Sequence, residues 1–302
     1  MPLRAATARA EYRGEQEIIM FEKLELISKT NCLVGEGPMW DERTRRLYFV
    51  DIVGSCYYVM DYSSGEKNKI DTPQQLGCMA MCENGDLILS MQDGVYFRNF
   101  SGELTLAHRP ADIKGRRFND GKVGPDGCYY VGTTDDNHEG AFYRLSGGVL
   151  TELFDHCGCS NGLDWSEDTQ KLYYCDSREQ KVECFDFSME KHDVSSRTSI
   201  LEMPEADGSF DGMTIDAAGN LWTAVWGGWC VLNIEPSTGT ILKKVELPVE
   251  KVSSCAFAGD DMRDLIITTA SVRTSLEEQP LAGCTFRVRC DVPGYHINRY
   301  QK

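Results

Sequence analysis

Six short segments with one shared pattern recur along the chain at nearly constant spacing. Each begins with a small or polar residue, reaches an apolar residue four positions later, passes a polar or glycine-containing turn, and enters a second apolar run. The segments begin at residues 36, 78, 119, 161, 211 and 253, so the steps are 42, 41, 42, 50 and 42 residues. Units of about 40–45 residues built from short strands are typical of β-propeller blades. The sequence therefore predicts an all-β, six-bladed β-propeller.

The apolar residues alternate with period two almost everywhere, as strands require, and no segment has a convincing helical pattern. A β-sandwich or two small β domains is the alternative, but neither explains regular spacing over six units. The longest step contains the polar stretch SMEKHDVSSR, residues 188–197. We expect this stretch to be a loop that projects from one face.

The chain has 302 residues, enough for one large domain or two ordinary ones. We expect the propeller to occupy residues 21–302 as a single domain. The first twenty residues, MPLRAATARAEYRGEQEIIM, differ from the rest. Their arginines and alanines suggest a transit peptide, but their glutamates argue against one. We therefore expect a disordered extension over residues 1–20.

Composition excludes several classes of partner. The net charge of −16 argues against nucleic acid and against anionic membranes, both of which need a basic surface. No apolar run approaches the roughly 18 residues that a membrane span requires. The thirteen cysteines include no pair at zinc spacing and follow no secretory signal, so we expect buried, reduced thiols and a cytoplasmic location.

The repeat places several polar side chains at one level. In a propeller the innermost strand of each blade lines the central channel. If the six segments are innermost strands, their first residues converge at one channel mouth. Those residues are two carboxylates, two amides, a thiol and a hydroxyl: Glu36, Asp211, Asn119, Asn161, Cys78 and Ser253. Carboxylate and amide oxygens suit a hard divalent cation, and no histidine shares the level, so a three-histidine zinc site is not expected.

Each of these residues also has a purely structural interpretation. Asn161-Gly162 is among the strongest hairpin-turn signals, and Asp211-Gly212 is a turn signal as well. The two interpretations are compatible, since a glycine after a ligand allows the backbone to bend sharply toward the channel.

Four stretches in this order resemble the senescence marker protein-30 (regucalcin), gluconolactonase and luciferin-regenerating enzyme family: GEGPMWD, RFNDGKVGPDG, SNGLDWS and DGMTIDAAGNLW. The resemblance extends from about residue 21 to the C-terminus. It implies a six-bladed propeller with one divalent metal in the central channel and hydrolysis of sugar-acid lactones or related esters. By resemblance, the metal ligands are Glu36, Asn161 and Asp211.

The resemblance also implies substrate-binding residues. Asn119 would lie at the metal through water or substrate, Arg117 would bind substrate oxygens, and Asp120 would lie beside the site. Arg116 is expected to face away, because adjacent side chains of an extended segment point in opposite directions. Family members from animals have a longer loop after the Gly-Thr step, with a glutamate that contacts substrate. The loop here, GTTDDNHEGAFYRL, is shorter, and its candidates for that contact are Asp135, Asp136 and Glu139, or none of them.

The resemblance thus implies a metal-dependent lactonase, and we hypothesise that Asp211 acts as general base and then general acid. The expected cation is calcium, with zinc, magnesium or manganese as alternatives. The expected partner is a small sugar lactone, with the protein a monomer or weak oligomer. Two other functions are compatible with the sequence: a calcium-binding regulatory protein, or a hydrolase of other esters on the same fold.

Overall fold

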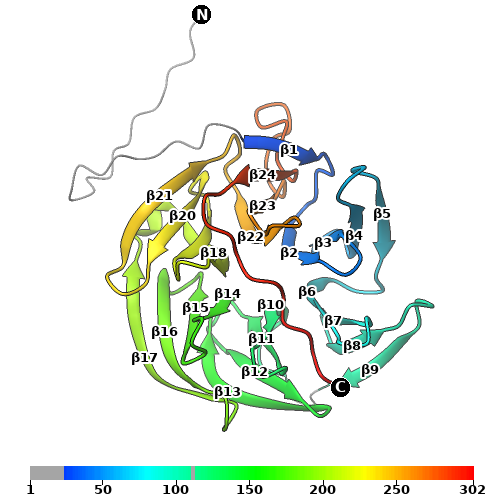
Figure 1. Ribbon diagram of the computed structural model, residues 1–302, viewed down its shortest axis with the longest axis vertical. Coiled ribbons are helices and arrows are strands. Elements are labelled where there is room, and N and C mark those ends of the chain that lie inside the picture. Colours follow the sequence, from blue (N-terminus) through cyan, green and yellow to red (C-terminus); the bar gives the residue numbers. More distant parts are fainter. Residues whose placement is uncertain (1–23, 110–112) are drawn as a thin grey trace, which may run out of the picture.

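The computed structural model describes residues 24–109 and 113–302, and this part of the chain is built almost entirely from strands. They form six four-stranded antiparallel sheets arranged in a ring around a central axis (Figure 1). The only helical element among the described residues is a three-residue 3-10 turn, η1 (Glu205–Asp207). The predicted six-bladed β-propeller is therefore confirmed, whereas the extension expected over residues 1–20 lies outside the described residues.

Each blade follows the chain from the channel outward. The first blade consists of β2 (Gly35–Asp41), β3 (Arg46–Asp51), β4 (Cys56–Asp61) and β5 (Lys67–Asp71). The second consists of β6 (Leu76–Met81), β7 (Leu87–Met91), β8 (Gly94–Arg98) and β9 (Leu104–His108). The third consists of β10 (Arg117–Val123), β11 (Tyr129–Thr134), β12 (Gly140–Ser146) and β13 (Val149–Cys157). The fourth and fifth blades are β14 (Ser160–Trp165), β15 (Lys171–Asp176), β16 (Lys181–Ser188) and β17 (Asp193–Glu202); and β18 (Ser209–Ile215), β19 (Leu221–Trp226), β20 (Cys230–Glu235) and β21 (Thr240–Glu246).

The sixth blade closes the ring with strands from both ends of the described chain. It consists of β22 (Val252–Ala258), β23 (Asp264–Thr269) and β24 (Thr285–Arg289), with β1 (Leu24–Ser28) as its outermost strand. β1 lies antiparallel to β24, with Leu24 opposite Val288. The Arg287 guanidinium donates to Glu25 Oε2 at 3.2 Å across this pair. Closure thus depends on hydrogen bonds between segments more than 250 residues apart.

Every innermost strand contains a register shift near its start. The shifts fall between Glu36 and Met39, Leu76 and Cys78, Phe118 and Gly121, Asn161 and Leu163, Phe210 and Met213, and Val252 and Ser254. A β-bulge leaves a residue out of the ladder and turns its side chain in a new direction, which is why bulges are frequent beside functional sites. Because each innermost strand contacts the innermost strands of both neighbouring blades, the six bulges lie around one end of the channel.

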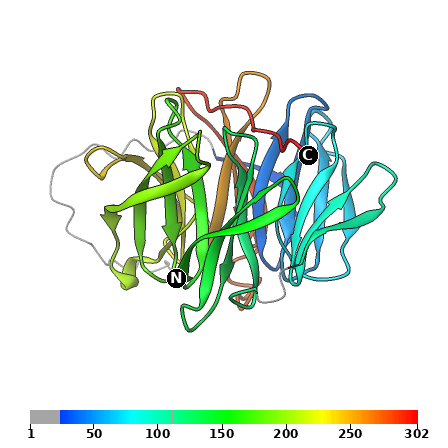
Figure 2. The same ribbon diagram turned by 90° about the horizontal axis from the view of Figure 1, so that it is seen from below.

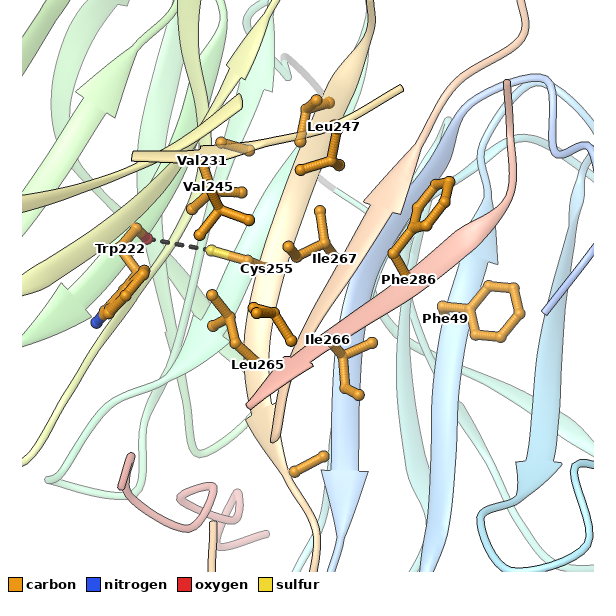
Figure 3. Packing of buried hydrophobic residues seen from close by; sticks show 14 of the residues in the cluster. Phe49, Trp222, Val231, Val245, Leu247, Cys255, Leu265, Ile266, Ile267 and Phe286 are labelled. Carbon is orange, nitrogen blue, oxygen red and sulfur yellow. Dashed lines mark hydrogen bonds between the residues drawn. The ribbon is translucent and has the colours of Figure 1, made fainter. Parts of the chain in front are cut away.

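The hydrophobic core lies between neighbouring blades. One cluster joins the sixth blade to the first and fifth, with Phe49, Trp222, Cys255 and Phe286 among its members (Figure 3). Within it the Cys255 thiol lies 3.2 Å from the backbone oxygen of Trp222. The six apolar residues that follow the segment starts by four positions are all buried: Trp40, Cys82, Val123, Trp165, Ile215 and Phe257. All thirteen cysteines are free, as expected from their spacing, and eleven of them are buried.

The loop expected over residues 188–197 is for the most part strand. Only residues 189–192 form a turn, and β17 begins at Asp193. β17 is the outermost strand of its blade and is largely exposed. An edge strand that faces solvent needs few apolar residues, so its polar composition resembles that of a loop.

After β24 the chain crosses one face of the ring, over the channel (Figures 1 and 2). Bridges join Gly294 to Asp216 and Tyr300 to Cys82. Below this segment the channel holds a cavity of about 460 Å³, bounded on that side by residues 295–298. The described residues include no helix that is long and apolar enough to cross a membrane.

A buried ion pair fastens the C-terminal segment. Arg299 Nη2 lies 2.6 Å from Asp41 Oδ1, and both side chains are only 5% exposed. Burial tends to raise the pKa of Asp41, but hydrogen bonds from Thr44 and Arg299 outweigh it and lower that pKa below its ordinary value. The pair therefore stabilises the fold only while Asp41 is ionised.

Candidate metal and substrate site

The channel mouth opposite the C-terminal segment gathers the predicted residues. Glu36, Asn119, Asn161 and Asp211 lie in β2, β10, β14 and β18, all near the bulges, and each is 5–7% exposed. The bulges explain why residues so far apart in sequence come to one place. Asn161-Gly162 is therefore neither a hairpin turn nor a free loop, because it forms the bulge of β14.

Among the predicted metal ligands, two side-chain oxygen atoms are buried without a hydrogen-bond partner in the described residues: Asn161 Oδ1 and Asp211 Oδ1. The Asn161 amide is oriented by its nitrogen, which donates to Ser177 Oγ at 2.9 Å. Ser177 in turn donates to the backbone oxygen of Phe210 at 2.6 Å. An unpaired buried acceptor costs about 1–3 kcal/mol, so two at one site indicate that they are available to a ligand.

The carboxylates of the mouth perturb one another. Burial raises the pKa of Glu36 well above its usual range, and the nearby charges of Asp211 and Asp120 raise it further. Burial, and then the charge of Asp120, raise the pKa of Asp211 in the same way. Desolvation and like-charge repulsion both disfavour the ionised forms. A bound cation would relieve both effects, so this donor set fits a divalent metal.

The Arg117 guanidinium interacts electrostatically with Glu36 and Asp211, but it has no ion-pair partner among the described residues. Its Nη1 atom donates to Asn119 Oδ1 at 2.7 Å and to the backbone oxygen of Phe118 at 2.9 Å. Burial lowers the pKa of its guanidinium. Arg116 is exposed and pairs with Asp136 at 2.5 Å, so the two arginines diverge as strand geometry predicts.

Asn119 and Asp120 occupy supporting positions. The side-chain oxygen of Asn119 accepts from Arg117, and its nitrogen donates to the backbone oxygen of Ser160 at 2.8 Å. Asp120 Oδ1 accepts from the Gly121 backbone at 2.7 Å, and its side chain borders the channel cavity. Asp120 does not form a three-carboxylate group with Glu36 and Asp211 within 4.8 Å. Its place beside the site remains a prediction from the resemblance.

The remaining positions at this level have structural contacts. Cys78 Sγ lies 3.1 Å from the Tyr129 hydroxyl, and Ser253 donates to the backbone oxygen of Gly35. In the neighbouring loop, Asp136 pairs with both Arg116 and Arg178, while Asp135 Oδ1 accepts from the Asn137 backbone and Glu139 is exposed. Asp136 is thus already engaged with two arginines.

Known proteins match this chain over most of its length. The family described as "SMP-30/Gluconolactonase/LRE-like region" matches residues 34–271. The chain belongs to this family. A regucalcin of Danio rerio is 35% identical over 276 residues, which cover 88% of this chain and 94% of the relative. A Bacillus subtilis (strain 168) protein provisionally named as a sugar lactone lactonase is 34% identical over 279 residues, covering 89% and 96%.

Solved structures share the fold of this family member. A luciferin-regenerating enzyme superposes with a TM-score of 0.86 at 25% identity, covering 93% of this chain and 99% of the other. A calcium-binding protein, regucalcin, from Agrobacterium tumefaciens str. C58 superposes with a TM-score of 0.88 at 24% identity, covering 94% and 98%. Membership in the family supports a function of the lactonase type.

Sequence reasoning missed Cys159 and Ser177. The Cys159 thiol lies 3.6 Å from Asn119 Nδ2 and 3.9 Å from Asn161 Nδ2, at the edge of the mouth. Burial raises its pKa to about 11, so it is present as a neutral thiol. Its place two residues before Asn161 was a usable signal, because alternate residues of an extended chain face the same side. No comparable signal marks Ser177.

Proposed function

We propose that this protein is a divalent-metal-dependent hydrolase that opens sugar-acid lactones. The observation that carries the proposal is the pair of unpartnered buried oxygens, Asn161 Oδ1 and Asp211 Oδ1, beside the Glu36 carboxylate. Arg117 supplies an unpaired cation at the same mouth, suited to the oxygens of a polar substrate. The many free thiols favour a reducing compartment such as the cytoplasm.

Glu36, Asn161 and Asp211 would hold the cation. Calcium is the expected ion because the three side chains offer oxygen donors only, although zinc, magnesium and manganese also bind such donors. When bound, the ion would polarise the lactone carbonyl and make a nearby water more acidic.

The chain's own residues carry the proton and orient the substrate. Asp211 would accept a proton from the water whose oxygen forms a bond to the carbonyl carbon. Asp211 would then return that proton to the ring oxygen as its bond to the carbonyl carbon breaks, leaving an open-chain hydroxy acid. Arg117, held by Asn119, would orient the substrate's oxygens, and Asp120 would add a second polar group beside them.

The test measures acid release from a panel of aldonolactones by metal-stripped protein reconstituted with each cation. Wild type is expected to be active with at least one cation, and Asp211→Ala to lose that activity while its unfolding transition stays cooperative. Asp71→Ala, at an exposed position on the outer strand β5, is the control and should keep full activity. Full activity in folded Asp211→Ala would refute the role of Asp211.

A second candidate function is calcium binding without catalysis. It is favoured by the description of the Agrobacterium tumefaciens relative as a calcium-binding protein. Calcium binding by wild type but not by Asp211→Ala, with no turnover of any lactone or simple ester, would support this function. Turnover of simple esters alone would support an ester hydrolase of different specificity.

A further inference from the structure

Three side chains of different types that can each bind a metal lie close together on one face of the propeller. This face is opposite to the channel mouth that contains Glu36. Asp126 and Cys128 belong to the turn that connects β10 to β11, and His192 belongs to the turn that connects β16 to β17. These turns come from the third and fourth blades, which are neighbours in the ring (Figure 1). Within the described residues, this is the only group of three His, Cys, Asp or Glu side chains whose donor atoms all lie within 4.8 Å of one another.

The three donors converge on one point. His192 Nδ1 lies 2.7 Å from Asp126 Oδ2 and 3.8 Å from Cys128 Sγ. A catalytic relay would place the thiol and the carboxylate on opposite nitrogens of the imidazole, whereas here both face Nδ1. Metal–ligand bonds of about 2.0–2.3 Å at tetrahedral angles place donors about 3.3–3.8 Å apart. The His192–Cys128 separation already lies in this range, and the Asp126–His192 separation has to lengthen by roughly 0.6 Å for a metal to replace the hydrogen-bonded proton.

We propose that Asp126, Cys128 and His192 form a second metal site, one that takes a zinc-class transition metal. The nitrogen, oxygen and sulfur donors set it apart from the oxygen-only channel mouth, because thiolate and imidazole select zinc-like ions over calcium and magnesium. On binding, the metal forms bonds to Nδ1, Oδ2 and Sγ. The Cys128 thiol proton passes to solvent, and Nδ1 gives up its proton while Nε2 carries the single proton of a neutral imidazole.

Surrounding groups hold the donors in place. Asp126 Oδ1 accepts from the Cys128 backbone at 3.1 Å, and Oδ2 accepts from the Tyr130 hydroxyl at 2.8 Å. The Tyr130 ring packs edge-on against Trp165 with centroids 5.2 Å apart, which gives the site an apolar wall. Hydrogen-bonded carboxylates and apolar shells of this kind orient metal ligands.

One side of the site is open. The Asp126 side chain is 1% exposed and Cys128 is buried, but the His192 side chain is 40% exposed. A fourth ligand, such as water, can therefore reach the metal from solvent. Because the donors come from two blades, the bound metal would fasten the third blade to the fourth and stabilise the folded state.

The test uses Co²⁺ as a spectroscopic probe of thiolate coordination and Zn²⁺ as the ion that stabilises. Metal-stripped wild type titrated with Co²⁺ should develop a thiolate-to-cobalt charge-transfer band that saturates at one equivalent. Zn²⁺ should abolish the band and raise Tm. Asp211→Asn, which disables the proposed channel site, should keep both responses, so the two sites are separated.

Two variants and one control complete the experiment. Cys128→Ala and His192→Gln should each lose the band, and each should lose the Zn²⁺-dependent rise in Tm when combined with Asp211→Asn, which removes zinc binding at the channel site. His192→Gln guards against misfolding because the His192 side chain is partly exposed. Cys184→Ala, a half-buried thiol elsewhere in the fourth blade, should behave as wild type. A band that persists in Cys128→Ala, or its absence from folded wild type, would overturn the proposal.

Discussion

Replacing Gly162 by alanine should disturb both the fold and the channel mouth through a single steric contact. A Cβ atom at Gly162 would lie 2.4 Å from the Asp211 backbone oxygen and 2.7 Å from Met213 Cβ. Ordinary van der Waals contact begins near 3.4 Å, so β14 and β18 would have to separate by about 1 Å. The obstructing atoms belong to the backbone and to a Cβ, so no side-chain rotation relieves the clash.

The expected cost of Gly162→Ala is about 1–3 kcal/mol of unfolding free energy, the range for overpacked interiors. The movement also separates Asn161 from Asp211, and a displacement of about 1 Å at a reacting group can lower the rate about 100-fold. Urea unfolding measures the first effect. Calcium affinity and acid release from an aldonolactone measure the second.

Gly219→Ala is the matched control. Gly219 lies in the turn at the other end of β18 with a left-handed φ of 84°, and a Cβ there meets nothing within 4 Å. The strained backbone should cost about 1–2 kcal/mol while leaving the mouth intact. If Gly162→Ala had wild-type stability, or lost no more activity than Gly219→Ala, the close approach of β14 to β18 would not be what requires glycine.

Three further predictions concern the charged residues. Arg299→Gln should cost about 3–5 kcal/mol of unfolding free energy because it leaves Asp41 buried without its cation. The control is Arg45→Gln, which removes an ion pair whose arginine side chain is 63% exposed and should cost less than about 1 kcal/mol. If urea unfolding gave the same loss of stability for both variants, the argument from burial would be contradicted. Since the pKa of Asp41 is lowered by folding, its contribution should be present above about pH 4 and be lost as the pH falls below that value, and Asp41→Asn should flatten the acid limb of a stability profile. Arg117→Gln should lower kcat/KM for aldonolactones by about 10–100-fold through loss of a charged hydrogen bond, whereas Arg116→Gln should leave it unchanged.

The fold was predictable because each blade repeats the same physical requirement. An innermost strand must present a polar or small residue at the channel mouth and an apolar one between the blades, and this pattern is visible in the sequence at every step. The outermost strands carry no such requirement, because they face solvent on one side. The error at residues 188–197 follows from that difference, since β17 is an exposed edge strand with a polar composition.

The residues of the candidate site were predictable because they occupy the same position in the repeated segments, but their hydrogen-bond partners were not. The sequence indicates that Asn119 reaches the mouth, yet only the structure places its oxygen on Arg117. Asp126 and His192 lie 66 residues apart, and each reads as an ordinary turn residue. Hydrogen-bond partners between blades depend on how two turns meet in space, which no local pattern encodes.

The glycines next to the predicted ligands are required for two different physical reasons. Gly37, after Glu36, adopts a left-handed φ of 51° and meets nothing within 4 Å of a Cβ, so there the backbone itself requires glycine. Gly162 and Gly212 have no such φ, but a Cβ on either would collide with the next innermost strand. The sharp bend expected after the ligands therefore holds for Glu36, whereas close packing of strands explains the glycines after Asn161 and Asp211.

The repeat supplies six equivalent positions at the mouth, but the side chains at these positions decide which of them can bind a ligand. The bulge is common to all six innermost strands, so it is a property of the scaffold. Cys78 and Ser253 use their polar atoms to join blades, whereas Asn161 and Asp211 retain unpartnered oxygens. The capacity of this mouth to bind a ligand thus depends on which polar atoms lack a hydrogen-bond partner within the protein. These unpartnered atoms say more than the fold does about what the protein binds.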